Sequence, residues 1–143
     1  MRKIILAGLL ASVAFAATAQ NNTSPLGKWK TLDDKTGKVM TVSEIYETKN
    51  GTLAAKIVEA VGSPATCTTC SGKYQNKPTV GIVTLWDLKA NKDGTWGGGK
   101  GYKPSEDRNF NAKSVKLVDG GKKLEIKGCV AFICRNATWV RAN

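Results

Sequence analysis

Turn signals recur at short intervals along this chain, and they constrain its fold more than any other feature. Glycine turns supply the positive φ that tight hairpins need. They stand at Thr36-Gly37, Asn50-Gly51, Asp93-Gly94 and Asp119-Gly120-Gly121. The runs between them are rich in Val, Ile, Thr, Trp and Tyr, and none keeps a 3.6-residue apolar period for three turns. We therefore predict strands near 26–32, 39–47, 52–60, 79–88, 95–102, 109–118, 123–129 and 134–141.

Several of these runs alternate apolar and charged residues. Leu53, Ala55 and Ile57 share one face, with Lys56 on the other. One buried face and one solvated face are typical of an antiparallel sheet. Eight hairpin-linked strands close most naturally into a barrel, which leaves no exposed edge. We predict an all-β fold for residues 26–143, a single small antiparallel up-and-down β-barrel of about eight strands.

Residues 1–19 are typical of a signal peptide rather than of a folded element. Arg2 and Lys3 precede an apolar run of 14 residues, and Ala17-Thr18-Ala19 is a small-x-small cleavage site. A membrane-spanning helix needs about 20 apolar residues. We therefore expect cleavage near Ala19, a periplasmic or secreted protein that does not span the membrane, and a disordered polar lead-in at 20–25. An uncleaved anchor is the alternative.

Charge and missing residue types limit the possible functions. The chain has 22 Lys and Arg against 11 Asp and Glu, a net charge of +11, which becomes +9 without Arg2 and Lys3. Such an excess favours anionic partners, although a merely Lys-rich surface explains it equally well, and export argues against nucleic acid. The chain has no His, which is the commonest general base and zinc ligand. We expect no enzyme activity, no metal and no cofactor.

Two short-range cysteine pairs, Cys67 with Cys70 and Cys129 with Cys134, allow three interpretations. A four-thiolate zinc site is disfavoured by the imperfect spacing and by an oxidising compartment. A thioredoxin-like redox pair should be followed by a helix, and no helical pattern follows Cys67. We expect two local disulfides, each contributing about 2 kcal/mol, which pin loops rather than hold the barrel together.

Aromatic and basic side chains supply the candidate binding residues, although such aromatic residues more often form a plain core. The residues that we expect to meet a ligand are Trp86, Trp96, Lys100, Tyr102, Phe132 and Arg135. The apolar stretch 130–133 has no turn residue, so we expect a lip over the barrel mouth or a docking patch; plain strand residues are the alternative.

The two ends of the barrel domain supply candidate barrel-closing residues. We expect Gly27, Trp29, Trp139 and Arg141 to close one end of the barrel. Arg141 would stack on the Trp29 ring, with Arg135 as the alternative cation.

Several segments are jointly distinctive and resemble a known family. They are Gly27 to Gly37, Ile45-Tyr46-Glu47, Cys67-x-x-Cys70 with Lys77-Pro78-x-Val80-Gly81, Gly98-Gly99-Lys100, Gly128-Cys129 followed by Cys134-Arg135, and Thr138-Trp139-x-Arg141. Together they resemble an exported bacterial family catalogued as domain of unknown function 2147. The resemblance implies a lipocalin-like (calycin-like) barrel outside the cytoplasm, with a cavity and no settled activity. Residues 104–109 depart from the family, whose members tend to show an Asp-Pro turn ending in Gly.

Two functions remain open. The first is a periplasmic or secreted binding barrel for a small, largely apolar ligand such as an anionic acyl chain. The alternative is a non-enzymatic envelope interaction module with a filled barrel, which docks on a protein or an anionic surface polymer. Salt should weaken polymer binding steeply and acyl-chain binding little.

Overall fold

The computed structural model describes residues 22–142, so the predicted signal peptide and the first two residues of the lead-in lie outside it. The strands are β1 (Gly27–Leu32), β2 (Val39–Glu47), β3 (Leu53–Ala60), β4 (Val83–Ala90), β5 (Trp96–Gly97), β6 (Gly99–Lys103), β7 (Arg108–Val118), β8 (Lys123–Val130) and β9 (Ile133–Arg141). Three short 3-10 turns, η1 (Gly72–Tyr74), η2 (Pro104–Glu106) and η3 (Asp119–Gly121), interrupt the connections. Across this part of the chain, every helix is too short to cross a bilayer.

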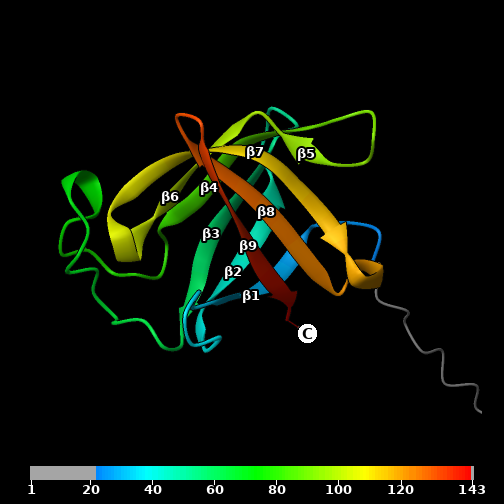
Figure 1. The fold of residues 1–143 in the computed structure, drawn as a ribbon. Helices are drawn as coiled ribbons and strands as arrows, with labels where there is room; N and C mark the ends of the chain where they lie inside the picture. The colour runs from blue at the N-terminus through cyan, green and yellow to red at the C-terminus, as the bar shows by residue number, and fades with distance from the viewer. Residues whose placement is uncertain (1–21, 143) are drawn as a thin grey trace, which may run out of the picture.

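The strands form a closed antiparallel barrel (Figure 1). With β5 and β6 taken together, each strand pairs with the next along the chain, and β9 returns to pair with β1. β5 and β6 act as one strand interrupted at Gly98, whose φ of +68° breaks the ladder. The predicted eight-stranded up-and-down barrel is therefore confirmed. The fourth strand begins at Val83 instead of residue 79, because the preceding residues belong to the β3–β4 loop.

The barrel interior is filled by its own side chains over much of its length. Inward positions alternate with outward ones, and the inward apolar residues pack into one buried cluster. Its members are Trp29, Ile45, Leu53, Ala55, Leu85, Leu88, Ala112, Val115, Leu124 and Ile126, with Trp96, Phe110, Leu117 and Trp139 packed against them. A small barrel filled in this way is a packed core rather than a pore.

The two ends of the barrel differ. One end, called the base here, carries the turns at 48–52, 91–95 and 119–122 and the chain entering at 22–26. The other, called the open end, carries the β1–β2 turn, the β3–β4 loop, η2 and the tip of the β8–β9 hairpin. The candidate site is therefore sought at the open end, where the inward positions reach solvent.

The β3–β4 loop (61–82) is the longest connection and is packed against the barrel. Cys67 and Cys70 share a second buried cluster with Ile57, Ile82 and Tyr102. This contact fixes the loop beside the strands β4 and β6.

Candidate functional site

The base is closed by one arginine. The guanidinium of Arg141 lies 4.3 Å from the centre of the Trp29 ring, which is fully buried. It donates hydrogen bonds to the carbonyls of Gly121 (2.8 Å), Ser24 (2.8 Å) and Leu26 (3.4 Å). These contacts commit the Arg141 side chain to the base and leave it unavailable to a ligand at the open end.

The other closure residues surround this contact. The indole nitrogen of Trp29 donates to the carbonyl of Pro25 at 2.8 Å, so part of the polar lead-in is held at the base. Gly27, with φ of +116°, lies beside the Arg141 guanidinium. Trp139 pairs with Thr31 and Leu124 and packs against the main core.

At the open end, three strands carry a basic residue in inward register. Along β7 the inward series runs Ala112, Phe110, Arg108 toward this end, and along β6 it runs Gly99, Gly101, Lys103. Along β9 the series runs Trp139, Ala137, Arg135. Apolar and small residues therefore give way to cations where the interior meets water.

The three basic residues share one acidic neighbour. The pKa of the Glu106 carboxyl lies below its ordinary value, chiefly because it accepts a hydrogen bond from Lys103, with further lowering by the charges of Arg108 and Arg135. Basic side chains from β6, β7 and β9 thus all lower the pKa of this one carboxyl group. Glu106 therefore lies near basic residues from three strands of the open end.

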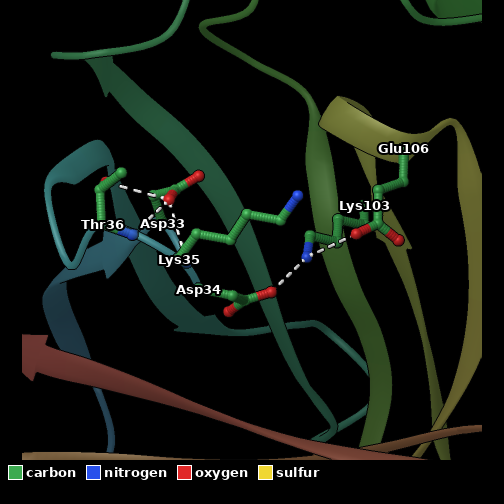
Figure 2. Close-up of polar contacts among 6 residues, drawn as sticks. All are labelled: Asp33, Asp34, Lys35, Thr36, Lys103 and Glu106. Atoms are coloured by element: carbon green, nitrogen blue, oxygen red, sulfur yellow. Dashed lines mark hydrogen bonds and ion pairs between the residues drawn. The ribbon is translucent and has the colours of Figure 1, made fainter.

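An ion-pair bridge spans this end of the barrel (Figure 2). Lys103 Nζ lies 2.7 Å from a carboxylate oxygen of Asp34 in the β1–β2 turn and 3.0 Å from one of Glu106 in η2. Three strands separate β1 from β6 in either direction around the ring, so this contact joins opposite walls. Partial burial lowers the pKa of Lys103, but its hydrogen bonds to both carboxylates outweigh that effect and raise the pKa overall.

The turn that presents Asp34 is built by its neighbour. The Asp33 carboxylate accepts hydrogen bonds from the amides of Lys35 (3.0 Å) and Thr36 (2.8 Å) and from the Thr36 hydroxyl (3.0 Å) (Figure 2). An aspartate that bonds to the backbone ahead of it is a typical turn-former. The bonds from Thr36 and Lys35 hold the pKa of the Asp33 carboxyl below its ordinary value.

The structure separates the six residues expected to meet a ligand. Trp86 pairs with Lys100, and both alternate with inward residues, so they lie on the outer face with Tyr102. Trp96 is half-buried against the core, and Phe132 is 92% exposed at the tip of the β8–β9 hairpin. Of the six, Phe132 and Arg135 lie at the open end, and only Arg135 is in inward register there.

Sequence reasoning missed Lys103 and Arg108. Both stand where a strand ends beside η2, and they pair with each other across the β6–β7 ladder. The signal available was period-2 alternation from Ala112 and Gly101, since each cation lies an even number of residues from an inward position.

Both predicted disulfides form. Cys67 is bonded to Cys70 and Cys129 to Cys134, with Cα–Cα distances of 5.5 and 4.0 Å. The first fixes the β3–β4 loop and the second fixes the β8–β9 hairpin. Both flank the outer face of the barrel rather than its interior.

Comparison with known proteins agrees with the fold. The structure is similar to that of protein HP1028 from the human pathogen Helicobacter pylori, described as belonging to the lipocalin family, with a TM-score of 0.67 and 26% sequence identity over 82% of each chain. No curated protein matches the sequence. The family model of an uncharacterised protein conserved in bacteria, DUF2147, matches residues 27–141. This chain, a closed barrel sealed by Arg141 with a basic open end, thus belongs to the DUF2147 family.

Proposed function

We propose that this lipocalin-like barrel binds a small anionic amphiphile at its open end, outside the cytoplasm, and that it binds without catalysis. The observation that carries the proposal is the inward register of Lys103, Arg108 and Arg135 above the apolar interior. A carboxylate or similar head would meet the cations, and its apolar part would lie against Phe110. The likeness to a lipocalin supports small-ligand binding in general.

The filled interior limits the length of the apolar part. The buried cluster extends up to Leu85 and Ala112, so a ligand chain contacts only the layer above it. Gly101 and Gly128, which flank the Phe110 ring, add no side chain of their own to that layer. Burying about six methylenes is worth roughly 5 kcal/mol, and association costs consume much of that. We therefore expect affinities in the high-micromolar to millimolar range.

Titration calorimetry with hexanoate, octanoate and decanoate tests the proposal. We expect saturable binding that weakens about tenfold or more in the double variant Arg108→Gln/Arg135→Gln, since a charge-assisted contact contributes about 1.5–3 kcal/mol. The matched control is Lys28→Gln/Lys30→Gln, which removes two exposed charges from the outer face of β1. Equal weakening in both double variants would show a general charge effect, and no binding of any of the three acids would contradict the proposal.

The bridge at the open end gives a second test of the same site. A bound anion must share Lys103 with Asp34 and Glu106. Removing one competing carboxylate, as in Asp34→Asn, should therefore tighten octanoate binding several-fold. The same affinity in wild type and variant would place the ligand elsewhere.

A docking role through the β8–β9 hairpin is the second candidate. Its tip carries Phe132 at 92% exposure and Ile133 at 63%, an apolar surface held by the Cys129–Cys134 bridge. Such a surface is typical of a contact site for a protein or surface polymer. Phe132→Ser/Ile133→Ser should abolish co-purification of an envelope component while leaving octanoate binding unchanged.

A further inference from the structure

A groove runs along the outer face of the barrel and reaches Gly101 and Phe110 at one end. Two adjoining hollows of about 340 and 530 Å³ share Trp86 and Asn109, and together they form what we call the outer groove. Its floor is made by outward side chains of β4, β6 and β7: Trp86, Lys100, Asn109 and Asn111. The combined size is that of a site for a small ligand or a short polymer segment.

Each disulfide of the protein stands at one wall of the outer groove. Ser71 to Tyr74, directly after the Cys67–Cys70 bridge, form one wall, and the hairpin residues 129–131 form the other. The first wall is also tied to η2, because the Thr69 hydroxyl donates to the carbonyl of Pro104 at 2.8 Å. Walls held in place before binding reduce the ordering cost that a ligand meets.

Asp107 completes the first wall without offering a free charge. Its carboxylate accepts hydrogen bonds from the Tyr102 hydroxyl (2.7 Å), the Ser71 amide (3.0 Å) and the Ser71 hydroxyl (3.1 Å). These bonds, that from Tyr102 first, hold the pKa of the Asp107 carboxyl below its ordinary value. Among the described residues, Asp107 is the only acidic group that lines the groove, and it is thus engaged in holding the wall.

The floor of the groove, by contrast, offers polar groups that no other described residue engages. Within residues 22–142, the side-chain amides of Asn109 and Asn111 and the ammonium of Lys100 have no hydrogen-bond or ion-pair partner. The two amides are two residues apart on β7, which spaces them by about 7 Å along the strand. Lys73, 4.9 Å from the centre of the Tyr74 ring, adds a second cation at the wall.

This set of groups matches one ligand chemistry. The flat indole of Trp86 offers a face on which the C–H groups of a pyranose ring can pack, and primary amides both donate to and accept from sugar hydroxyls. Lys100 and Lys73 favour carboxylate groups on that sugar. The groove is open along its length, which suits a chain rather than an enclosed small molecule.

We propose that the outer groove binds a linear acidic saccharide, stacked on Trp86 and hydrogen-bonded to Asn109 and Asn111, with its carboxylates at Lys100 and Lys73. The groove and the open end both border Phe110 and Gly101, but their cations differ: Lys100 and Lys73 line the groove, whereas Lys103, Arg108 and Arg135 lie at the open end. The groove gives a function to both disulfides, which hold its walls.

Calorimetry and saturation-transfer NMR with hexagalacturonate test the proposal, with maltohexaose as the neutral counterpart. We expect hexagalacturonate to bind and Trp86→Ala to weaken it about tenfold or more, a loss of about 1.4 kcal/mol. Asn109→Ala and Lys100→Gln, at exposed positions that do not disturb the core, should each weaken it several-fold. The matched controls are Tyr46→Ala and Lys30→Gln on β2 and β1, which should leave the affinity unchanged.

Three results would overturn the proposal. One is the absence of saturable binding of hexagalacturonate to the wild-type protein. Another is an equal loss of hexagalacturonate affinity in the groove variants Asn109→Ala and Lys100→Gln and in the control variants, which would indicate a diffuse effect rather than a site. The third is equal binding of maltohexaose, which would contradict an acidic ligand. The open-end variant Arg108→Gln/Arg135→Gln should leave hexagalacturonate binding unchanged, so failure at one site is distinguishable from failure at the other.

Discussion

Arg141 shows how much one side chain contributes at the residue scale. Its planar guanidinium stacks on Trp29 while it donates to three backbone carbonyls from two segments, the entering chain at 22–26 and η3. A lysine keeps the charge but has neither the plane nor the fork of donors. We expect Arg141→Lys to lower the free energy of unfolding by about 2–3 kcal/mol in urea denaturation, from lost charge-assisted hydrogen bonds and cation–π contact.

The control for this prediction is a charge-removing variant at the same end of the barrel. Lys123→Gln, on β8 beside the same base, removes a charge that makes no ion pair in the described structure. It should change the free energy of unfolding by less than about 0.5 kcal/mol. A similar loss in both variants would mean that Arg141 acts only as a surface charge.

Gly101 illustrates a close approach that requires glycine. A methyl group on Gly101 would overlap the ring atoms of Phe110 on the paired strand, although the backbone there is ordinary for any residue. Overpacking of this kind costs about 1–3 kcal/mol. We predict that Gly101→Ala lowers the free energy of unfolding by that amount.

The double variant tests the cause of this loss. If the clash with Phe110 is responsible, Gly101→Ala should cost little when introduced into Phe110→Ala, giving a coupling energy of at least about 1 kcal/mol in a double-mutant cycle. Additive losses would place the cost of Gly101→Ala elsewhere.

At the scale of elements, Tyr102 couples a strand to a loop and makes that coupling depend on pH. Burial, and then its hydrogen bond to Asp107, raises the pKa of Tyr102 to about 12 from an ordinary 10.0. The native state therefore favours the protonated phenol. Its contribution to stability is fully present below pH 10 and is lost as the pH rises through about 12.

Comparison with a phenylalanine variant isolates this effect. Between pH 9 and pH 11.5 the free energy of unfolding of the wild-type protein should fall more steeply than that of Tyr102→Phe, since lysine deprotonation occurs in both proteins and cancels. Urea denaturation at several pH values measures the two slopes. Parallel slopes would show that the Tyr102 phenol does not keep its proton preferentially in the native state.

The sequence predicts the positions of the strands well, but it does not predict which face of the sheet each residue lies on. Turn glycines and alternation such as that of Leu53, Ala55 and Ile57 determine where strands begin and end, because these are local properties. The side of the sheet on which a residue lies depends on every bulge or register shift that precedes it in the strand. Strand β4 has two irregularities, a shifted register against β3 and the positive φ of Asp87 (+57°). Because of them, Leu85 and Leu88 lie on one side of the sheet and Trp86 lies on the other.

From the sequence, only two kinds of contact could be predicted: those between paired strands and those between cysteines that are close along the chain. Arg141 follows from the closing pair of strands, and the cysteine pairs follow from their short separation. The bridge from Lys103 to Asp34 joins residues on opposite walls. No local pattern predicts it, since it depends on closure of the whole ring.

At the scale of the whole molecule, the packed barrel and the two disulfides contribute separately to the stability of the fold. The barrel is closed by backbone pairing and filled by a continuous core, whereas each disulfide links residues at most five apart. Bridges that close such small rings remove little entropy from the unfolded chain. The bridges therefore shape the walls of the outer groove without determining the fold.

This division predicts the behaviour of a protein without disulfides. With all four cysteines replaced by serine, the far-ultraviolet circular dichroism spectrum should remain that of a β-barrel, and the free energy of unfolding should fall by about 4 kcal/mol, the sum expected for two short rings. Octanoate binding at the open end should persist, because that site lies on strands of the barrel, whereas hexagalacturonate binding should weaken several-fold as both walls loosen. An unfolded variant would show that the bridges are needed for the fold, and unchanged affinity for both probes would show that the walls keep their positions without them.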